Sequence, residues 1–255
     1  MTNTIGFFGD SFCADKRNHH SFYHGYETYI AKLSKHYDAK IVNYGHGGTG
    51  VWDTLLLQLD PLIKANKVPD ICVFVWSLPA RIFNRKVRRL NQADALYPKL
   101  HTYNPLQSKI WKAAAEYYKH LLDWEKEELE YIAALRYIDD VVLPKLEGKK
   151  IVHLWSTGKT TEWSTEGARP SNITYLHNWK HGVEIRPALL SLSMYDSDIS
   201  VLQTDHRCNH LDGEFKNKQV YDWIVFALET GNNVDFSTSI DKLYDKSQEV
   251  DHRAI

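Results

Sequence analysis

The chain has 255 residues, 43% of them hydrophobic and 25% charged, and its 31 basic and 32 acidic residues leave a net charge of −1 at pH 7. This composition is typical of a globular protein, and the length is sufficient to bury a full core without disulfides or metal ions. The near-neutral charge excludes a chain-wide attraction to nucleic acid or to an anionic membrane, so we expect neither as a partner.

The predicted elements alternate between strand and helix from the N-terminus onward. A strand in TIGFFGDS (4–11) precedes a helix in ETYIAKLSKHY (27–37), and a strand in AKIVNYGHGGTG (39–50) precedes a helix in VWDTLLLQLDPLIKAN (51–66). The run PDICVFVWS (69–77) is apolar at almost every position. Such a run predicts a parallel strand that is buried on both faces.

The second half of the chain continues this alternation. Residues 106–143 have an apolar period of 3.6 residues that ends before Pro144, which predicts one long helix or two in tandem. The segment KKIVHLWS (149–156) predicts another strand, and FKNKQVYDWIVFALETG (215–231) predicts an amphipathic helix that ends at a glycine. The order predicts an α/β fold with a doubly wound parallel sheet and right-handed crossovers.

Candidate functional residues follow the first three predicted strands. Ligand sites in such sheets lie beyond the carboxyl ends of the strands. Those ends carry Ser11 after the first strand, the glycines of 45–50 after the second, and Ser77 after the third. Ser11 is therefore a candidate nucleophile, and its backbone amide and that of Gly48 are candidate donors to a developing oxyanion.

A serine nucleophile needs a base, and the base needs an orienting partner. The segment TDHRCNHLDGEF (204–215), just before the last predicted helix, holds Asp205 and His210. A carboxylate there could orient an imidazole that faces Ser11, which gives the chain order Ser, Asp, His. A second interpretation, that Asp205 is an acidic residue of a surface turn, explains it nearly as well.

Three sequence blocks resemble those of the SGNH or GDSL hydrolases: FFGDSF, NYGHGGTG and DHRCNHL, in this order. The resemblance implies a three-layer α/β/α sandwich with a parallel, flavodoxin-like sheet. We expect a single domain over residues 1–255, in which 236–255 form a C-terminal tail. The resemblance also implies Ser11 as nucleophile and first oxyanion donor, Gly48 as second donor and His210 as general base. No cofactor and no metal ion is implied.

Two positions depart from the family pattern. The family places Gly-x-Asn-Asp after the third strand, where this chain reads VFVWSLPARIF (73–83), so Ser77 or Arg81 replaces the asparagine as oxyanion donor, or that donor is absent. Arg81 could instead pair with a carboxylate of a neighbouring loop. The family's acid stands three residues before the histidine, where this chain has Arg207, so Asp205 is the nearest candidate.

The Trp-Ser-x-x-x-Arg pattern and the Asn-His-Leu form are similar to a divergent branch found in tailed bacteriophages, which implies a link to a virion. The cysteines Cys13, Cys72 and Cys208 are an odd number without a pairing pattern, which is typical of a reducing compartment. The sequence shows no signal peptide and no apolar run of membrane-spanning length. We expect a cytoplasmic protein, or one carried in a particle assembled there.

Several patterns have a structural and a functional interpretation. Ser11 could be a turn residue capped by Asp10, and the glycines of 45–50 could hold a phosphate, although no Gly-Lys-Ser/Thr follows them. Except at Arg81, the basic run 81–89 is better explained as a solvated surface than as a contact with an acidic polymer. Core packing is favoured over sugar stacking for Trp163 and Trp179. Metal binding by His19, His20, His24, His206 and His210 is disfavoured, because no cysteine or carboxylate cluster completes a site.

The sequence thus predicts a serine esterase that hydrolyses small acyl esters through an acyl-enzyme, with O-acetyl carbohydrate as the favoured substrate class. One alternative is a catalytically inactive carbohydrate-binding or structural relative, which the two departures favour. Another is a lipid or thioester acyl hydrolase, which would have a wide apolar groove.

Overall fold

A computed structural model of the protein describes residues 3–13, 27–87, 90–96, 105–159, 169–194, 211 and 213–251. Six strands form one sheet in the order β2-β1-β3-β6-β7-β8, and every neighbouring pair is parallel. They are β1 (Thr4–Gly9), β2 (Lys40–Asn43), β3 (Ile71–Trp76), β6 (Lys150–Trp155), β7 (Val183–Arg186) and β8 (Val234–Asp235). The predicted α/β fold with a parallel, flavodoxin-like sheet is confirmed.

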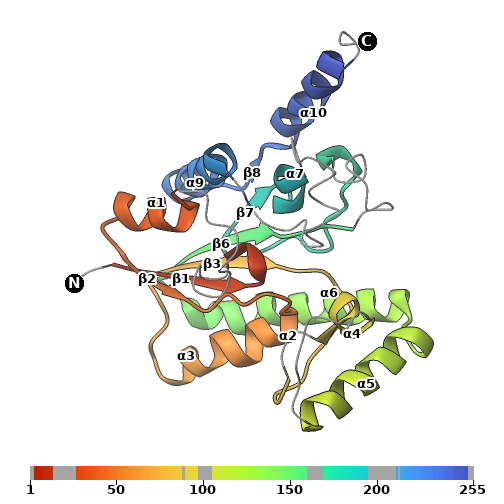
Figure 1. The fold of residues 1–255 in the computed structure, drawn as a ribbon. Coiled ribbons are helices and arrows are strands. Elements are labelled where there is room, and N and C mark those ends of the chain that lie inside the picture. Colours follow the sequence, from red (N-terminus) through yellow and green to blue (C-terminus); the bar gives the residue numbers. More distant parts are fainter. Residues whose placement is uncertain are drawn as a thin grey trace.

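Helices cover both faces of the sheet, which gives three layers (Figure 1). One layer contains α1 (Tyr29–His36), α7 (Leu189–Met194) and α9 (Gly213–Thr230), and α10 (Ser237–Asp251) starts from this layer and projects outward. The other contains α2 (Val51–Asp53), which continues through the π-helical turns Thr54–Leu59 into α3 (Asp60–Lys64), and α6 (Trp124–Tyr137), which continues through Ile138–Val142 to Leu146.

The central strands are buried on both faces because their side chains alternate between two cores. In β3, Val73 and Val75 pack into the core beneath α1 and α9, whereas Phe74 and Trp76 pack into the core beneath α2 and α6. All six residues of β3 are buried, as predicted from the apolar run.

The long periodic segment forms two helices in tandem. The first, α5 (Pro105–His120), is separated from α6 by a turn in which the Asp123 carboxylate accepts hydrogen bonds from the first amides of α6. Together with α4 (Gln92–Leu96) and the hairpin of β4 (Arg81–Ile82) and β5 (Leu90–Asn91), α5 encloses a small separate core. This subsidiary unit lies beyond α6 and α2, at the periphery of the molecule (Figure 1).

Two strands and one helix lie where the sequence gave no clear signal. The strands β7 and β8 have four and two residues, too few for a visible alternation. Residues 236–255, which we expected as a C-terminal tail, include α10. Ile240 and Tyr244 of this helix are buried in the core, and the Tyr244 hydroxyl donates to the Ser191 carbonyl oxygen at 2.7 Å.

Candidate active site

Gly9 ends β1 and directs the chain out of the sheet. Its φ is +126°, and a Cβ atom at this position would lie 2.1 Å from the Val75 carbonyl oxygen, so no other residue fits without moving β3. The side chain of Gln58 accepts from the Gly9 amide at 2.7 Å and donates to the Gly9 carbonyl at 3.2 Å. The same carbonyl accepts from the Thr49 hydroxyl at 2.8 Å. Gly9 is thereby fixed on both sides.

Ser11 follows in a short 3-10 turn, Ser11–Cys13. The Asp10 carboxylate caps this turn by accepting from the Phe12 amide at 3.1 Å, and the Asp10 carbonyl accepts from the Cys13 amide at 3.2 Å. Asp10 therefore caps the turn, as the structural interpretation expected. This cap also holds Ser11 at the carboxyl edge of the sheet, so it is compatible with a catalytic role.

The loop after β2 packs directly against this turn. The Asn43 amide donates to the Cys13 carbonyl at 2.7 Å, and its oxygen accepts from the Gly45 amide at 2.8 Å. A Cβ atom on Gly45 would lie 2.6 Å from the Cys13 sulfur, so glycine permits the close approach. Farther along the loop, Gly48 has a φ of +78°, in the left-handed region that favours glycine.

The loop after β3 carries Ser77 and Arg81. Ser77 is buried, and its carbonyl oxygen accepts a hydrogen bond from the Tyr131 hydroxyl. The Arg81 guanidinium donates to the Thr49 carbonyl at 2.6 Å and lies 3.8 Å from the Asp10 carboxylate. Arg81 thus connects the loops after β1, β2 and β3, and pairs with a neighbouring carboxylate as its structural interpretation proposed.

Burial controls the ionisation of the groups beside Ser11. Burial raises the pKa of the Cys13 thiol well above its usual range, and the Asp10 charge adds to this effect. Cys13 therefore stays protonated near neutral pH and is a poor nucleophile. Burial likewise raises the pKa of Tyr29, whose hydroxyl donates to the Phe12 carbonyl at 2.9 Å. Ser11 is the remaining hydroxyl or thiol candidate in this turn.

The structure brings four predicted residues, Ser11, Gly48, Ser77 and Arg81, onto three hydrogen-bonded loops at one sheet edge. The predicted base His210 and acid Asp205 lie outside the described residues, as do the histidines considered for metal binding and Trp163. Trp179 is buried and stacks on the His153 ring at 3.9 Å between centroids, which confirms the core interpretation.

A series of hydrogen bonds connects the end of the base block to the nucleophile turn. Leu211, the residue after His210, accepts at its carbonyl from the Asn217 side chain at 2.9 Å. The Asn217 oxygen accepts from the Tyr29 amide at 3.0 Å, and the Tyr29 hydroxyl reaches the Phe12 carbonyl. These bonds link Leu211, the first described residue after the base block, to the turn that carries Ser11.

Sequence reasoning missed the polar residues that hold these loops together, namely Asn43, Thr49, Gln58, Tyr29 and Asn217. A signal existed for one of them, because Gln58 interrupts the apolar run Leu55–Leu59 on a buried helix face. The other four occupy ordinary positions at strand ends and helix starts, and their partners are distant in sequence.

An apolar cavity of about 510 Å³ opens beside Arg81. It lies between α2 and α6 on one side and the subsidiary unit of α5 and the β4–β5 hairpin on the other. Its apolar lining includes Val51, Trp52, Leu78, Ile82, Phe83 and Ile110. Apart from Arg81, the charged groups on its lining have partners within it: Lys126 pairs with Glu130 at 3.0 Å, and Glu127 accepts from the Tyr117 hydroxyl. The cavity is therefore suited to an apolar group.

Within the described ranges, no three His, Cys, Asp or Glu side chains are placed to hold a metal ion. The described helices also include none with the length and apolar character needed to cross a membrane.

No protein-family model matches the sequence, and a comparison with curated proteins gives no match. Among solved structures, one neighbour is a family two carbohydrate esterase from Clostridium thermocellum in complex with cellohexaose, with 13% sequence identity and a TM-score of 0.30. The alignment covers 65% of this chain and 45% of that chain, so this chain spans less than half of the neighbour's length. A likeness at this level does not transfer a site from that protein.

Proposed function

We propose that the protein is a serine ester hydrolase in which Ser11 is the nucleophile and His210 the general base. The observation that carries this proposal is the hydrogen-bond series from Leu211 through Asn217 and Tyr29 to Phe12. It ties the residue after His210 to the residue after Ser11, and adjacent Cα atoms are only about 3.8 Å apart. We therefore expect residue 210 at the same edge of the sheet as Ser11, and we propose that its imidazole faces the Ser11 hydroxyl.

The reaction proceeds in two steps. Neutral His210 accepts the proton of the Ser11 hydroxyl, and the serine oxygen attacks the acyl carbonyl carbon. The Ser11 and Gly48 amides stabilise the oxyanion, and protonated His210 then donates its proton to the leaving alcohol. In the second step His210 accepts a proton from water, whose oxygen attacks the acyl-enzyme carbonyl; the acid leaves as His210 returns the proton to the Ser11 oxygen. Asp205 orients the imidazole and stabilises its charged form.

The loop after β3 supplies a further donor and a positioning residue. Ser77 stands at the carboxyl end of β3, level with Ser11, so we assign its hydroxyl as a third oxyanion donor. The Arg81 guanidinium already contacts the Thr49 carbonyl and the Asp10 carboxylate. We therefore assign Arg81 as a positioning residue that holds the three loops together.

For the substrate, we propose a small acyl ester, with O-acetyl carbohydrate as the first candidate class. The apolar cavity beside Arg81 favours a second candidate, an ester or thioester with a longer acyl chain. Burial of apolar surface contributes about 25 cal/mol per Å², so a chain seated in this cavity would bind more tightly than an acetyl group.

The decisive experiment is to treat the protein with a fluorophosphonate probe and to locate the modified residue by mass spectrometry. We expect labelling at Ser11 that is lost in Ser11→Ala and strongly reduced in His210→Ala. His206→Ala is the matched control, because it removes an imidazole from the same segment. No labelling of the folded protein would instead favour the inactive carbohydrate-binding or structural alternative.

A chain-length series separates the two substrate classes. Hydrolysis of p-nitrophenyl acetate, butyrate and octanoate is compared between the natural protein and Ala113→Phe, which fills the cavity from α5. If long acyl chains occupy the cavity, Ala113→Phe lowers kcat/KM for octanoate and leaves acetate unchanged. If the ratio of kcat/KM for octanoate to kcat/KM for acetate is the same in both proteins, the cavity does not bind the acyl chain, and short acyl groups are the substrate class.

A further inference from the structure

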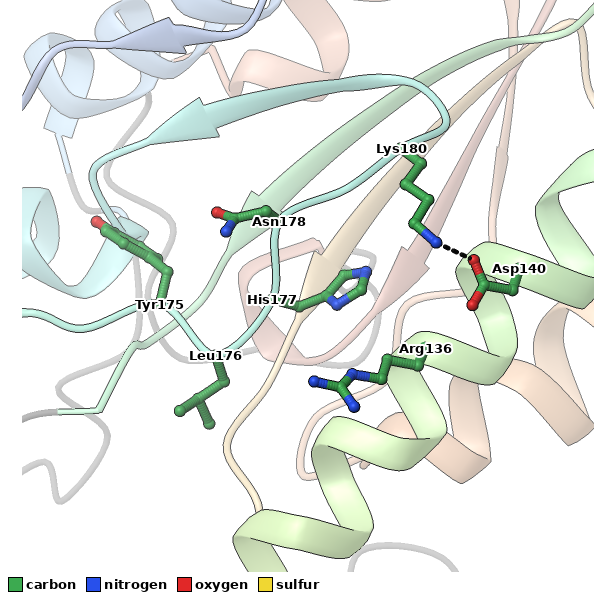
Figure 2. Close-up of a pocket in the computed structure, with 7 residues that line it drawn as sticks. All are labelled: Arg136, Asp140, Tyr175, Leu176, His177, Asn178 and Lys180. Atoms are coloured by element: carbon green, nitrogen blue, oxygen red, sulfur yellow. Dashed lines mark hydrogen bonds and ion pairs between the residues drawn. The ribbon is translucent and has the colours of Figure 1, made fainter.

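A second pocket, which is polar and has a volume of about 320 Å³, lies beside the loop that precedes β7, whereas Ser11 follows β1. Its walls are α6 and the loop 175–180, which precedes β7 (Figure 2). The loop leads into the amino end of β7, whereas Ser11 follows the carboxyl end of β1 in the same parallel sheet. Tyr175 and Asn178 also contact Arg186, the last residue of β7, so the pocket runs along the α6 face of the sheet. The strands β3 and β6 separate β7 from β1, which carries the candidate active site.

The loop is held by the buried carboxylate of Asp139, which is 0% exposed. Asp139 accepts from the His177 ring at 2.9 Å, from the Lys180 amide at 2.9 Å, and from the ring and amide of His181 at 3.0 and 3.2 Å. Burial acts to raise the pKa of Asp139, but these hydrogen bonds outweigh it and hold the pKa below its ordinary value. We call the side chains of Asp139, His177 and His181 the Asp139 network.

Trp179 fixes the middle of the same loop. It is buried and stacks on His153, and its ring centroid lies 4.9 Å from that of Trp76 on β3. With Trp179 held in the core and Asp139 holding the residues on either side, the backbone of 177–181 is ordered before any ligand arrives. A preorganised loop spends little binding free energy on ordering.

The pocket contains two cations and one exposed carboxylate. Lys180 pairs with Asp140 at 2.8 Å, and Figure 2 shows this pair on one side of the pocket with the Arg136 guanidinium directed toward the loop of Leu176 and His177. The Asp140 hydrogen bond raises the pKa of Lys180, while the nearby charge of Arg136 acts in the opposite direction. Within the described part of the chain, Arg136 has no carboxylate partner.

The remaining polar side chains of the pocket also present donors. The Asn178 oxygen accepts from Arg186 at 2.9 Å, so the amide nitrogen with its two N–H groups remains to serve a ligand. The Asp139 carboxylate is saturated by its four donors and shielded from solvent, so it does not act as a free anion in the pocket. Hydrogen-bond donors therefore outnumber the acceptors that a ligand would meet.

We propose that this pocket binds the oxyanion group of a small acid, a phosphate or a carboxylate, with Arg136 as the principal ligand and Lys180 and Asn178 as further donors. The planar guanidinium matches the geometry of both groups and binds them through two parallel hydrogen bonds. The volume leaves room for a small organic body attached to the acidic group. This site is separate from ester hydrolysis and does not depend on it.

The test is isothermal titration calorimetry of the full chain in 150 mM NaCl, with inorganic phosphate and glucuronate as separate probes. We expect saturable binding of at least one probe with a stoichiometry of one, and a loss of affinity of about tenfold or more in Arg136→Gln, since a charge-assisted bond is lost. Arg136 is exposed, so the variant keeps the fold, which circular dichroism checks.

Arg85→Gln is the matched control, because it removes an exposed arginine from the β4–β5 hairpin, outside this pocket. Its affinity is expected to equal that of the natural protein. Absence of saturable binding by both probes would overturn the proposal. So would binding that survives Arg136→Gln, because the anion would then occupy another place, such as the oxyanion site beside Ser11.

Discussion

Two buried aspartates organise two loops, one that follows β1 and one that precedes β7, and they do so differently. Asp10 caps the backbone of the Ser11 turn and lies 3.8 Å from Arg81. Asp139 has two imidazoles and two amides as donors. An aspartate–histidine pair is often taken as a sign of catalysis, yet the pocket beside Asp139 is lined by no serine or cysteine among the described residues. The presence of a candidate nucleophile, rather than the pair alone, distinguishes the candidate active site.

The largest expected effect is that of Ser11→Ala on catalysis. We expect kcat for p-nitrophenyl acetate to fall by about 10⁴-fold or more, because the nucleophile is removed, while the thermal midpoint stays within a few degrees. Ser239→Ala, at an exposed position of α10, is the control and should keep full activity. Activity of Ser11→Ala within tenfold of the natural protein would contradict the assignment.

In the loop that precedes β7, Asp139→Ala tests stability instead of chemistry. Removal of this buried carboxylate leaves four donors without their acceptor, so the free energy of unfolding should fall by ~3–5 kcal/mol. Urea denaturation measures the change. Asp140→Ala, next in sequence but exposed, should cost less than about 1 kcal/mol because its pair with Lys180 is solvated. Equal costs for the two variants would refute a structural role for the Asp139 network.

Ser77→Ala examines the third oxyanion donor. Loss of one such donor typically lowers kcat by ~10²- to 10³-fold, with little change in KM, because the bond forms mainly in the transition state. Ser156→Ala is a close control, since Ser156 also follows a strand end but its hydroxyl donates to the Trp76 carbonyl at 2.9 Å. If steady-state kinetics give the same kcat for both variants, the oxyanion is held by backbone amides alone.

The smallest effect concerns His153, in the β6 strand beside the Asp139 network. Burial lowers the pKa of His153 to about 3 from an ordinary value of 6.5, so the folded protein binds this proton less readily than the unfolded chain. Its contribution to stability is present above pH 6.5 and is lost as the pH falls toward 3. Between pH 6.5 and 5 the loss amounts to about 2 kcal/mol.

Urea titrations at pH 7, 6 and 5 measure this dependence. His153→Gln keeps an acceptor for the Trp76 indole and a donor for the His181 carbonyl but does not titrate. The variant should therefore show a flatter pH dependence than the natural protein. If the free energy of unfolding falls equally with pH in both proteins, groups other than His153 cause the loss of stability at low pH.

The strands and the edge that carries the site were predictable because the signals are local. β1, β3 and β6 are apolar runs, and Gly9 and Ser77 mark where two of these strands end. β7 was missed because it is short and contains buried Glu184, whose carboxylate accepts from the Trp155 indole at 2.7 Å and pairs with Arg186 at 3.0 Å. Nothing near Glu184 in the sequence predicts its contact with the Trp155 indole.

The contacts that assemble the site were not predictable for a similar reason. Gln58 acts on a glycine 49 positions away, and Asn217 acts on an amide 188 positions away. Periodicity reports which face of an element is buried, but it does not report which buried polar groups meet. The pairing of Arg81 with Asp10 was foreseen only as one of two alternatives, because a long guanidinium stem reaches several partners.

The geometry at Gly9 also separates what a related protein needs to keep the fold from what it needs to keep the activity. A chain that replaced Ser11 would lose a hydroxyl and keep the sheet, whereas one that replaced Gly9 would force β1 away from Val75 on β3. Divergent descendants of this protein should therefore retain the glycine even where the chemistry has lapsed. In a search for relatives, a glycine at this position indicates a shared fold, and only the serine two positions later indicates a shared activity.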